Sequence, residues 1–121
     1  MNHNLDFNYR MSNSFLSINL KIKLDESIFN TDIFGYSEST DLPSNDRITK
    51  WITMIENDIY HYDIFSYNNE NTKIDIGLKN NYFHINGLNI PIKLIKNDLI
   101  MFLKKFIEIN KKENISYKQI L

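Results

Sequence analysis

Residues 16–24 have the sequence LSINLKIKL, in which apolar and polar side chains alternate without a break. Every second residue is Leu or Ile, and Ser, Asn and Lys fill the positions between them. Successive side chains of a strand point to opposite faces, so this alternation predicts an antiparallel strand with one buried face. We therefore expect a strand over residues 14–24.

The segments on either side of this strand have weaker patterns. Residues 1–13 are mostly polar and contain an alternation of Phe7, Tyr9 and Met11, which is compatible with a flexible lead-in or with a short edge strand. Residues 27–36 contain Ile and Phe without a clear period, and we expect a second strand there with a bend or bulge. Residues 37–46 are rich in Ser, Asp and Glu and are predicted to form a loop.

Two segments have the spacing of amphipathic helices. Ser44 is a favourable N-cap, and it is followed by apolar residues at intervals of three and four that include Trp51 as a predicted core residue. Asn97 is a candidate N-cap for a second helix that ends near Lys112. The predicted buried stripe of this second helix consists of Leu99, Phe102, Leu103 and Phe106.

Four short strands are predicted between the helices. Asn80-Asn81 and Asn86-Gly87 are tight-turn sequences, because Asn and Gly tolerate positive φ. Pro91 has no N–H to donate, which favours an edge position for the last strand. The four predicted strands are 62–67, 73–79, 82–85 and 88–94.

The predicted order is strand–strand–helix–strand–strand–strand–strand–helix. Hairpin spacing favours a mostly antiparallel meander, so the fold class is α+β with both helices packed on one face of the sheet. At 121 residues the chain fits one domain. We expect a lead-in or edge strand over 1–13, a single domain over 14–112 and a C-terminal tail over 113–121.

Composition limits the classes of function. Without cysteine the chain has no disulfide framework, thiolate zinc site or cysteine nucleophile. It has no signal-like segment and no apolar run long enough for a membrane span, so we expect a cytoplasmic protein that contacts no membrane. A net charge of −1 argues against a nucleic-acid partner, and no cofactor motif occurs. Abundant Ile and Asn, without Ala or Val, indicate an AT-rich genome.

The charge is distributed unevenly along the chain. Residues 1–60 carry five basic and nine acidic side chains, whereas residues 61–121 carry nine basic and six acidic ones. No Lys or Arg lies between Asp25 and Asp46, a stretch with several carboxylates. Three interpretations remain open: a solvated loop, a contact surface for a basic partner, or a metal or acid/base site.

The leading functional hypothesis is a non-enzymatic protein-binding module. Small size, a meander with two helices and an acidic loop give a layout similar to small bacterial immunity proteins and to phage or viral inhibitors. On this hypothesis the loop covers a basic site on a protein partner. The expected binding residues are Tyr36 as an aromatic anchor, with Glu38, Asp41 and Asp46.

Two alternatives use residues of the predicted sheet. A small ligand such as a nucleotide signal would bind in a concave pocket lined by Tyr62, Lys73, Tyr82 and His84. A hydrolase or nuclease would instead bring His61 and His84 together beside Asp63 or Asp75. The sequence has no spacing of residues that is typical of metal ligands. A sheet face left uncovered by the helices would allow the chain to form a homo-oligomer.

Overall fold

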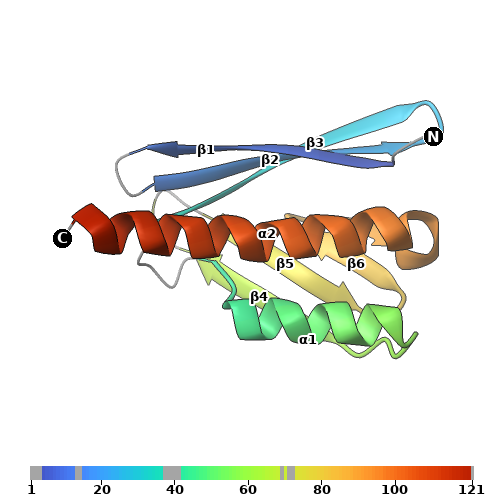
Figure 1. Ribbon diagram of the computed structural model, residues 1–121. Helices are drawn as coiled ribbons and strands as arrows, with labels where there is room; N and C mark the ends of the chain where they lie inside the picture. Colours follow the sequence, from blue (N-terminus) through green and yellow to red (C-terminus); the bar gives the residue numbers. More distant parts are fainter. Residues whose placement is uncertain (1–3, 13–14, 37–41, 69, 71–72, 121) are drawn as a thin grey trace.

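The chain forms two antiparallel sheets and two helices in the computed structural model, which describes residues 4–12, 15–36, 42–68, 70 and 73–120 (Figure 1). The elements are β1 (Leu5–Ser12), β2 (Phe15–Leu24), β3 (Ser27–Tyr36), α1 (Asn45–Glu56), β4 (Asp63–Asn68), β5 (Lys73–Lys79), β6 (Tyr82–Ile85), β7 (Leu88–Pro91) and α2 (Ile92–Ile120). Within the described part of the chain, no helix combines the length and apolar character needed to cross a membrane.

Each sheet is a simple meander. The first has the order β1-β2-β3 and the second has the order β4-β5-β6-β7. The alternation in residues 16–24 buries one face of β2, as predicted, because its Leu and Ile side chains up to Ile22 are at most 1% exposed. The Asn86-Gly87 turn is also confirmed, with positive φ angles of 44° and 87° that suit these two residue types.

The two helices lie side by side on the second sheet, and α2 runs between α1 and the first sheet (Figure 1). The Phe102 ring of α2 contacts both sheets, with centroid distances of 5.1 Å to Phe7 on β1 and 6.4 Å to Phe83 on β6. Trp51 of α1 is fully buried, as predicted. One core therefore joins the two sheets and the two helices.

The α+β class with antiparallel strands is confirmed, but the arrangement differs from the prediction in two respects. The N-terminal segment forms the edge strand that was one of the two expectations for residues 1–13, and this strand, β1, adds one element to the predicted order. The strands also divide between two sheets, because β3 leads into α1 and pairs only with β2. Residues 27–36 pair with β2 in one continuous register, without the expected bulge.

The second helix starts earlier and ends later than predicted. It begins at Ile92, directly after Pro91, and continues to Ile120 instead of ending near Lys112. Pro91 has a fixed φ and no N–H, so the strand ends there, and the N–H of Ile92 donates to the carbonyl of Asn81 at 2.9 Å. Asn97 consequently lies inside the helix and does not cap it.

Candidate functional site

A row of polar side chains crosses the face of the second sheet that points away from the helices. His84 on β6 lies opposite Asn89 on β7 and diagonally from Asp75 on β5. Its Nε2 is 2.5 Å from Oδ2 of Asp75, and its Nδ1 is 2.8 Å from Oδ1 of Asn89. The His84 side chain is only 12% exposed and the Asp75 side chain 23%. The three side chains form a closed hydrogen-bonded row.

This arrangement restricts the chemistry available to His84. A general base needs a free ring nitrogen near the proton that it removes, and a metal ligand needs a free lone pair. Both ring nitrogens of His84 already face an oxygen atom. Ser66 lies opposite Asp75 on β4, so the carboxylate stands between this hydroxyl and the imidazole. The row therefore lacks the nucleophile–base contact of a hydrolytic triad.

The structure separates the two histidines of the hydrolase hypothesis. His84 pairs with Gly77, which pairs in turn with Ile64, three residues beyond His61. His61 is exposed in the connection before β4. Two strand spacings of about 4.8 Å therefore separate the backbone of His84 from that of Ile64, and His61 lies a further three residues along the chain. Asp75 contacts His84, and the other proposed carboxylate, Asp63, binds Arg47 instead.

The four residues of the ligand-binding hypothesis are also spread along the sheet. Lys73 begins β5, whereas Tyr82 pairs with Lys79 at the opposite end of the same strand. The two lysines are six positions apart, which corresponds to about 20 Å. Tyr62 precedes β4 and is 64% exposed. Of the four residues, Tyr82 alone lines an open hollow of about 440 Å³ on this face, whose lining is Lys79, Asn80, Asn81, Tyr82 and Asn89.

The acidic segment is described only at its borders. The backbone of Tyr36 ends β3, but its side chain, Glu38 and Asp41 lie outside the described residues. Asp46 is exposed in the first turn of α1, where a carboxylate also stabilises the helix dipole. Asp25 and Glu26 lie at the far end of β3, about 30 Å away at 3.3 Å per residue. Asp25 and Glu26 therefore lie far from the end of β3 that precedes the acidic segment.

The two borders of residues 37–41 are packed against each other. A Cβ atom added to Gly35 would lie 2.5 Å from Cγ of Leu42, so the leucine side chain rests directly on the glycine. Leu42 is 9% exposed and belongs to the hydrophobic core. The chain thus leaves β3 and returns to α1 at one fixed point.

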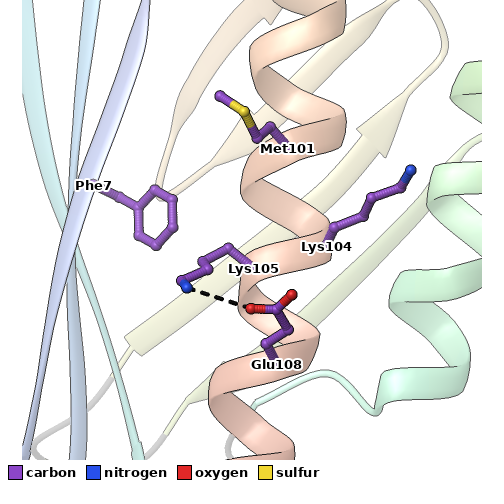
Figure 2. A pocket seen from close by; sticks show the side chains of 5 residues that line it. All are labelled: Phe7, Met101, Lys104, Lys105 and Glu108. Carbon is purple, nitrogen blue, oxygen red and sulfur yellow. Dashed lines mark hydrogen bonds and ion pairs between the residues drawn. The ribbon is translucent and has the colours of Figure 1, made fainter.

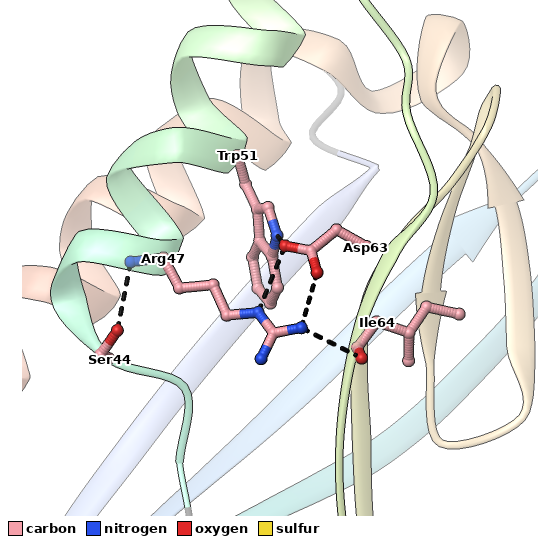
Figure 3. Close-up of polar contacts among 5 residues, drawn as sticks. All are labelled: Ser44, Arg47, Trp51, Asp63 and Ile64. Carbon is pink, nitrogen blue, oxygen red and sulfur yellow. Dashed lines mark hydrogen bonds and ion pairs between the residues drawn. The ribbon is translucent and has the colours of Figure 1, made fainter.

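Arg47, the first basic residue after the acidic segment, turns toward the protein (Figure 3). Its Nη2 donates to Oδ1 of Asp63 at 2.6 Å and to the carbonyl of Ile64 at 3.2 Å. Its guanidinium carbon is 5.9 Å from the ring centroid of Trp51 and 5.6 Å from that of Phe65. These contacts connect α1 to β4.

Asp63 is the acceptor at the centre of this connection. Besides Arg47, the indole Nε1 of Trp51 donates to its Oδ2 at 2.6 Å. The hydrogen bond from Arg47, followed by that from Trp51, holds the pKa of Asp63 below its usual value of 3.8, although partial burial opposes this shift. Asp63 is therefore a structural anion with fixed donors.

Asn89 and Arg47 are the residues whose roles the sequence analysis missed. Once the Asn86-Gly87 turn fixes the hairpin, Asn89 falls opposite His84. The position of the turn in the sequence therefore already indicated the partner of the His84 imidazole. Arg47 had no comparable signal, since its carboxylate lies 16 residues away. Among the described residues, no three His, Asp or Glu side chains are grouped as a metal site. Comparison of the chain with protein families, curated proteins and solved structures gives no match.

Proposed function

We propose that this chain is a non-enzymatic protein-binding module that covers a basic site on a partner protein, acting in the cytoplasm. Its contact surface is the acidic segment before α1, with Glu38, Asp41 and Asp46 as the charged residues and Tyr36 as an aromatic anchor. This is the role of the immunity proteins and inhibitors that the layout resembles. The supporting observation is the opposite orientation of two neighbours, Asp46 and Arg47.

The orientation of Arg47 leaves the segment without its nearest counter-charge. The guanidinium is engaged by Asp63 and Ile64 and lies close to the rings of Trp51 and Phe65, whereas the carboxylate of Asp46 is exposed. Asp46 therefore presents an exposed carboxylate beside the acidic segment, and charge complementarity with a basic partner mainly raises the association rate and specificity.

The packing of Leu42 on Gly35 also supports the proposal, because it fixes both ends of the acidic segment. A segment whose ends are held at one point loses less conformational entropy when it binds than a segment with free ends. Such a base suits an inhibitor that presents a short segment to a partner.

Capture of partners from extracts of the native source tests this proposal. The wild-type chain is compared with Glu38→Lys combined with Asp41→Lys, and with a control that reverses the same number of charges elsewhere, Glu26→Lys combined with Glu70→Lys. We expect a protein with a basic surface that the wild type and the control retain and that the segment variant loses. A partner retained equally by all three chains contradicts the proposal, and so does the absence of any partner whose retention depends on the segment.

A second candidate function rests on the hollow beside Tyr82. Tyr82 is 45% exposed, and Lys79 and three asparagines line the same hollow, a set of residues that suits a ligand with an aromatic ring and a phosphate. Thermal-shift measurements with nucleotides test it. Stabilisation that disappears in Tyr82→Ala favours this function, and the same melting temperature with and without nucleotides at high excess excludes it.

A further inference from the structure

The two sheets have four edge strands, and three of them are obstructed. The β6–β7 turn meets β3, where Nδ2 of Asn86 donates to the carbonyl of Asp32 at 2.7 Å. On β4, Arg47 occupies the carbonyl of Ile64. The fourth strand, β7, has four residues and ends in Pro91. Obstructions of this kind prevent a sheet from pairing with another chain.

The remaining edge, β1, has no such protection. Its sequence, LDFNYRMS, contains no Pro, Gly or Lys, and no described strand lies on its outer side. Residues 8–12 are all exposed, including Tyr9 at 39% and Met11 at 36%. An eight-residue edge with exposed apolar side chains is a template for strand addition.

The register with β2 defines which backbone groups of β1 are available. The N–H of Lys23 donates to the carbonyl of Asn4 at 2.7 Å, and the pairing of Leu5 with Ile22 puts Asn4 directly opposite Lys23. Groups that face the partner strand alternate in an antiparallel pair. The even-numbered residues therefore bond to β2, and the N–H and C=O groups of Leu5, Phe7, Tyr9 and Met11 point to the open edge.

We propose that β1 pairs with β1 of a second copy of this chain, antiparallel and centred on Asn8. In this register Phe7 of one copy lies opposite Tyr9 of the other, and their outward N–H and C=O groups form a hydrogen-bonded pair. Asp6 lies opposite Arg10 of the second copy on the solvent face, once on each side of the twofold axis. The three-stranded sheets of the two copies then join into one continuous six-stranded sheet.

Charge complementarity selects this register. Within the described part of the chain, no ion pair or side-chain hydrogen bond involves Asp6 or Arg10, and both are exposed. A register centred on Phe7 or on Tyr9 also satisfies the backbone, but it places Asp6 opposite Asn8 or Ser12. Opposite charges facing each other across two strands stabilise the pair, and like charges destabilise it.

A groove beside the open edge has room for side chains of the second copy (Figure 2). It has a volume of about 460 Å³ and is lined by Phe7, Met101, Lys104, Lys105 and Glu108. Met101 is 56% exposed in it. Tyr9 of the second copy, opposite Phe7 and on the same face, would enter this groove and cover Met101. The apolar side chains of the paired strands then fit into this groove without movement of α2.

Sedimentation measurements on the purified chain test the proposal, together with single charge reversals. In Asp6→Arg, arginines face each other across the twofold axis, and in Arg10→Asp, carboxylates do so. We expect wild-type dimers, at least about tenfold weaker dimerisation of each single variant, and recovery when the two variants are mixed or when both exchanges are made in one chain. Lys23→Glu, on the same face of β2, is the matched control and should dimerise like the wild type.

Wild-type protein that stays monomeric at about 1 mM overturns the proposal, because such pairing would be weaker than about −4 kcal/mol. Dimerisation that both single reversals leave unchanged also overturns it, since the interface would then lie elsewhere. Circular dichroism of each variant separates loss of pairing from loss of folding, and recovery in the mixture requires both chains to be folded. The experiment contains no other protein, so its outcome is independent of the partner proposed above.

Discussion

Nδ2 of Asn86, in the β6–β7 turn, donates to Oγ1 of Thr31 on β3 at 2.8 Å, across 55 residues of sequence. The same Nδ2 donates to the carbonyl of Asp32, and Oδ1 of Asn86 accepts from the N–H of Asp75 at 3.1 Å. A residue whose conformation forms a tight turn therefore also joins the two sheets. Local geometry and long-range contact depend on the same side chain.

Asn86→Gly separates these two functions of the residue. Glycine adopts the φ of 44° at least as easily as asparagine, so the turn is retained, but three side-chain hydrogen bonds are lost. We expect a loss of about 1–3 kcal/mol in the free energy of unfolding. Asn80→Gly, at another positive φ of 57°, is the control and should leave stability nearly unchanged. Equal stabilities of the two variants in urea denaturation would show that the inter-sheet contacts contribute nothing.

The ion pair between Arg47 and Asp63 predicts a dependence of stability on pH. A lowered pKa means that folding favours the ionised carboxylate, so its contribution is present above the usual pKa of 3.8 and is lost as pH falls through the folded-state pKa. Asp63→Asn should destabilise the fold by about 1–3 kcal/mol at pH 7, with partial exposure of Arg47 limiting the effect. The difference from the wild type should shrink below about pH 4. A difference that stays constant from pH 7 to pH 3 would be inconsistent with this ion pair.

Gly77 lies where β4 passes very close to β5. An added Cβ atom would lie 2.7 Å from Cα of Ile64 and closer still to the carbonyl oxygen of Asp63. Both are backbone atoms that cannot rotate away, so Gly77→Ala should cost about 1–3 kcal/mol. Ser66→Ala, at an exposed position of β4, should change stability by less than about 0.5 kcal/mol. Thermal denaturation compares the two, and an unchanged melting temperature for Gly77→Ala would exclude the close approach.

The row of Asp75, His84 and Asn89 predicts energetic coupling between two side chains. In a double-mutant cycle, His84→Ala and Asp75→Ala should each destabilise the fold, and together they should cost less than the sum by about 0.5–3 kcal/mol. His61→Ala, at an exposed position, should be nearly neutral. Additive effects of the first two substitutions would mean that the contact of 2.5 Å between Nε2 and Oδ2 carries no net stabilisation.

Local features of the fold were predictable from the sequence, whereas contacts between distant elements were not. The alternation in residues 16–24 defines the buried face of β2 on its own, and Ser44 caps α1 by accepting from the N–H of Arg47 at 3.2 Å. The separation into two sheets depends on which strands pair across α1, and no local pattern records this. The same holds for the side chain of Asn86, whose partners lie on β3.

The candidate site was predictable to a smaller extent. Asp75 was one of the two carboxylates expected beside a pair formed by His61 and His84, and it does contact His84. That both nitrogens of the imidazole are occupied follows only from the register of β7. Asp46 was assigned to the loop over residues 37–46, whereas α1 already begins at Asn45, and the inward orientation of Arg47 required the position of β4.

The affinity of a captured partner for charge variants tests the proposed function most directly. Titration calorimetry should give a dissociation constant at least about tenfold higher for Glu38→Lys combined with Asp41→Lys than for the wild type, and a steep weakening with salt. The control, Glu26→Lys combined with Glu70→Lys, should bind like the wild type. Equal dissociation constants for all three chains would contradict an acidic contact surface before α1.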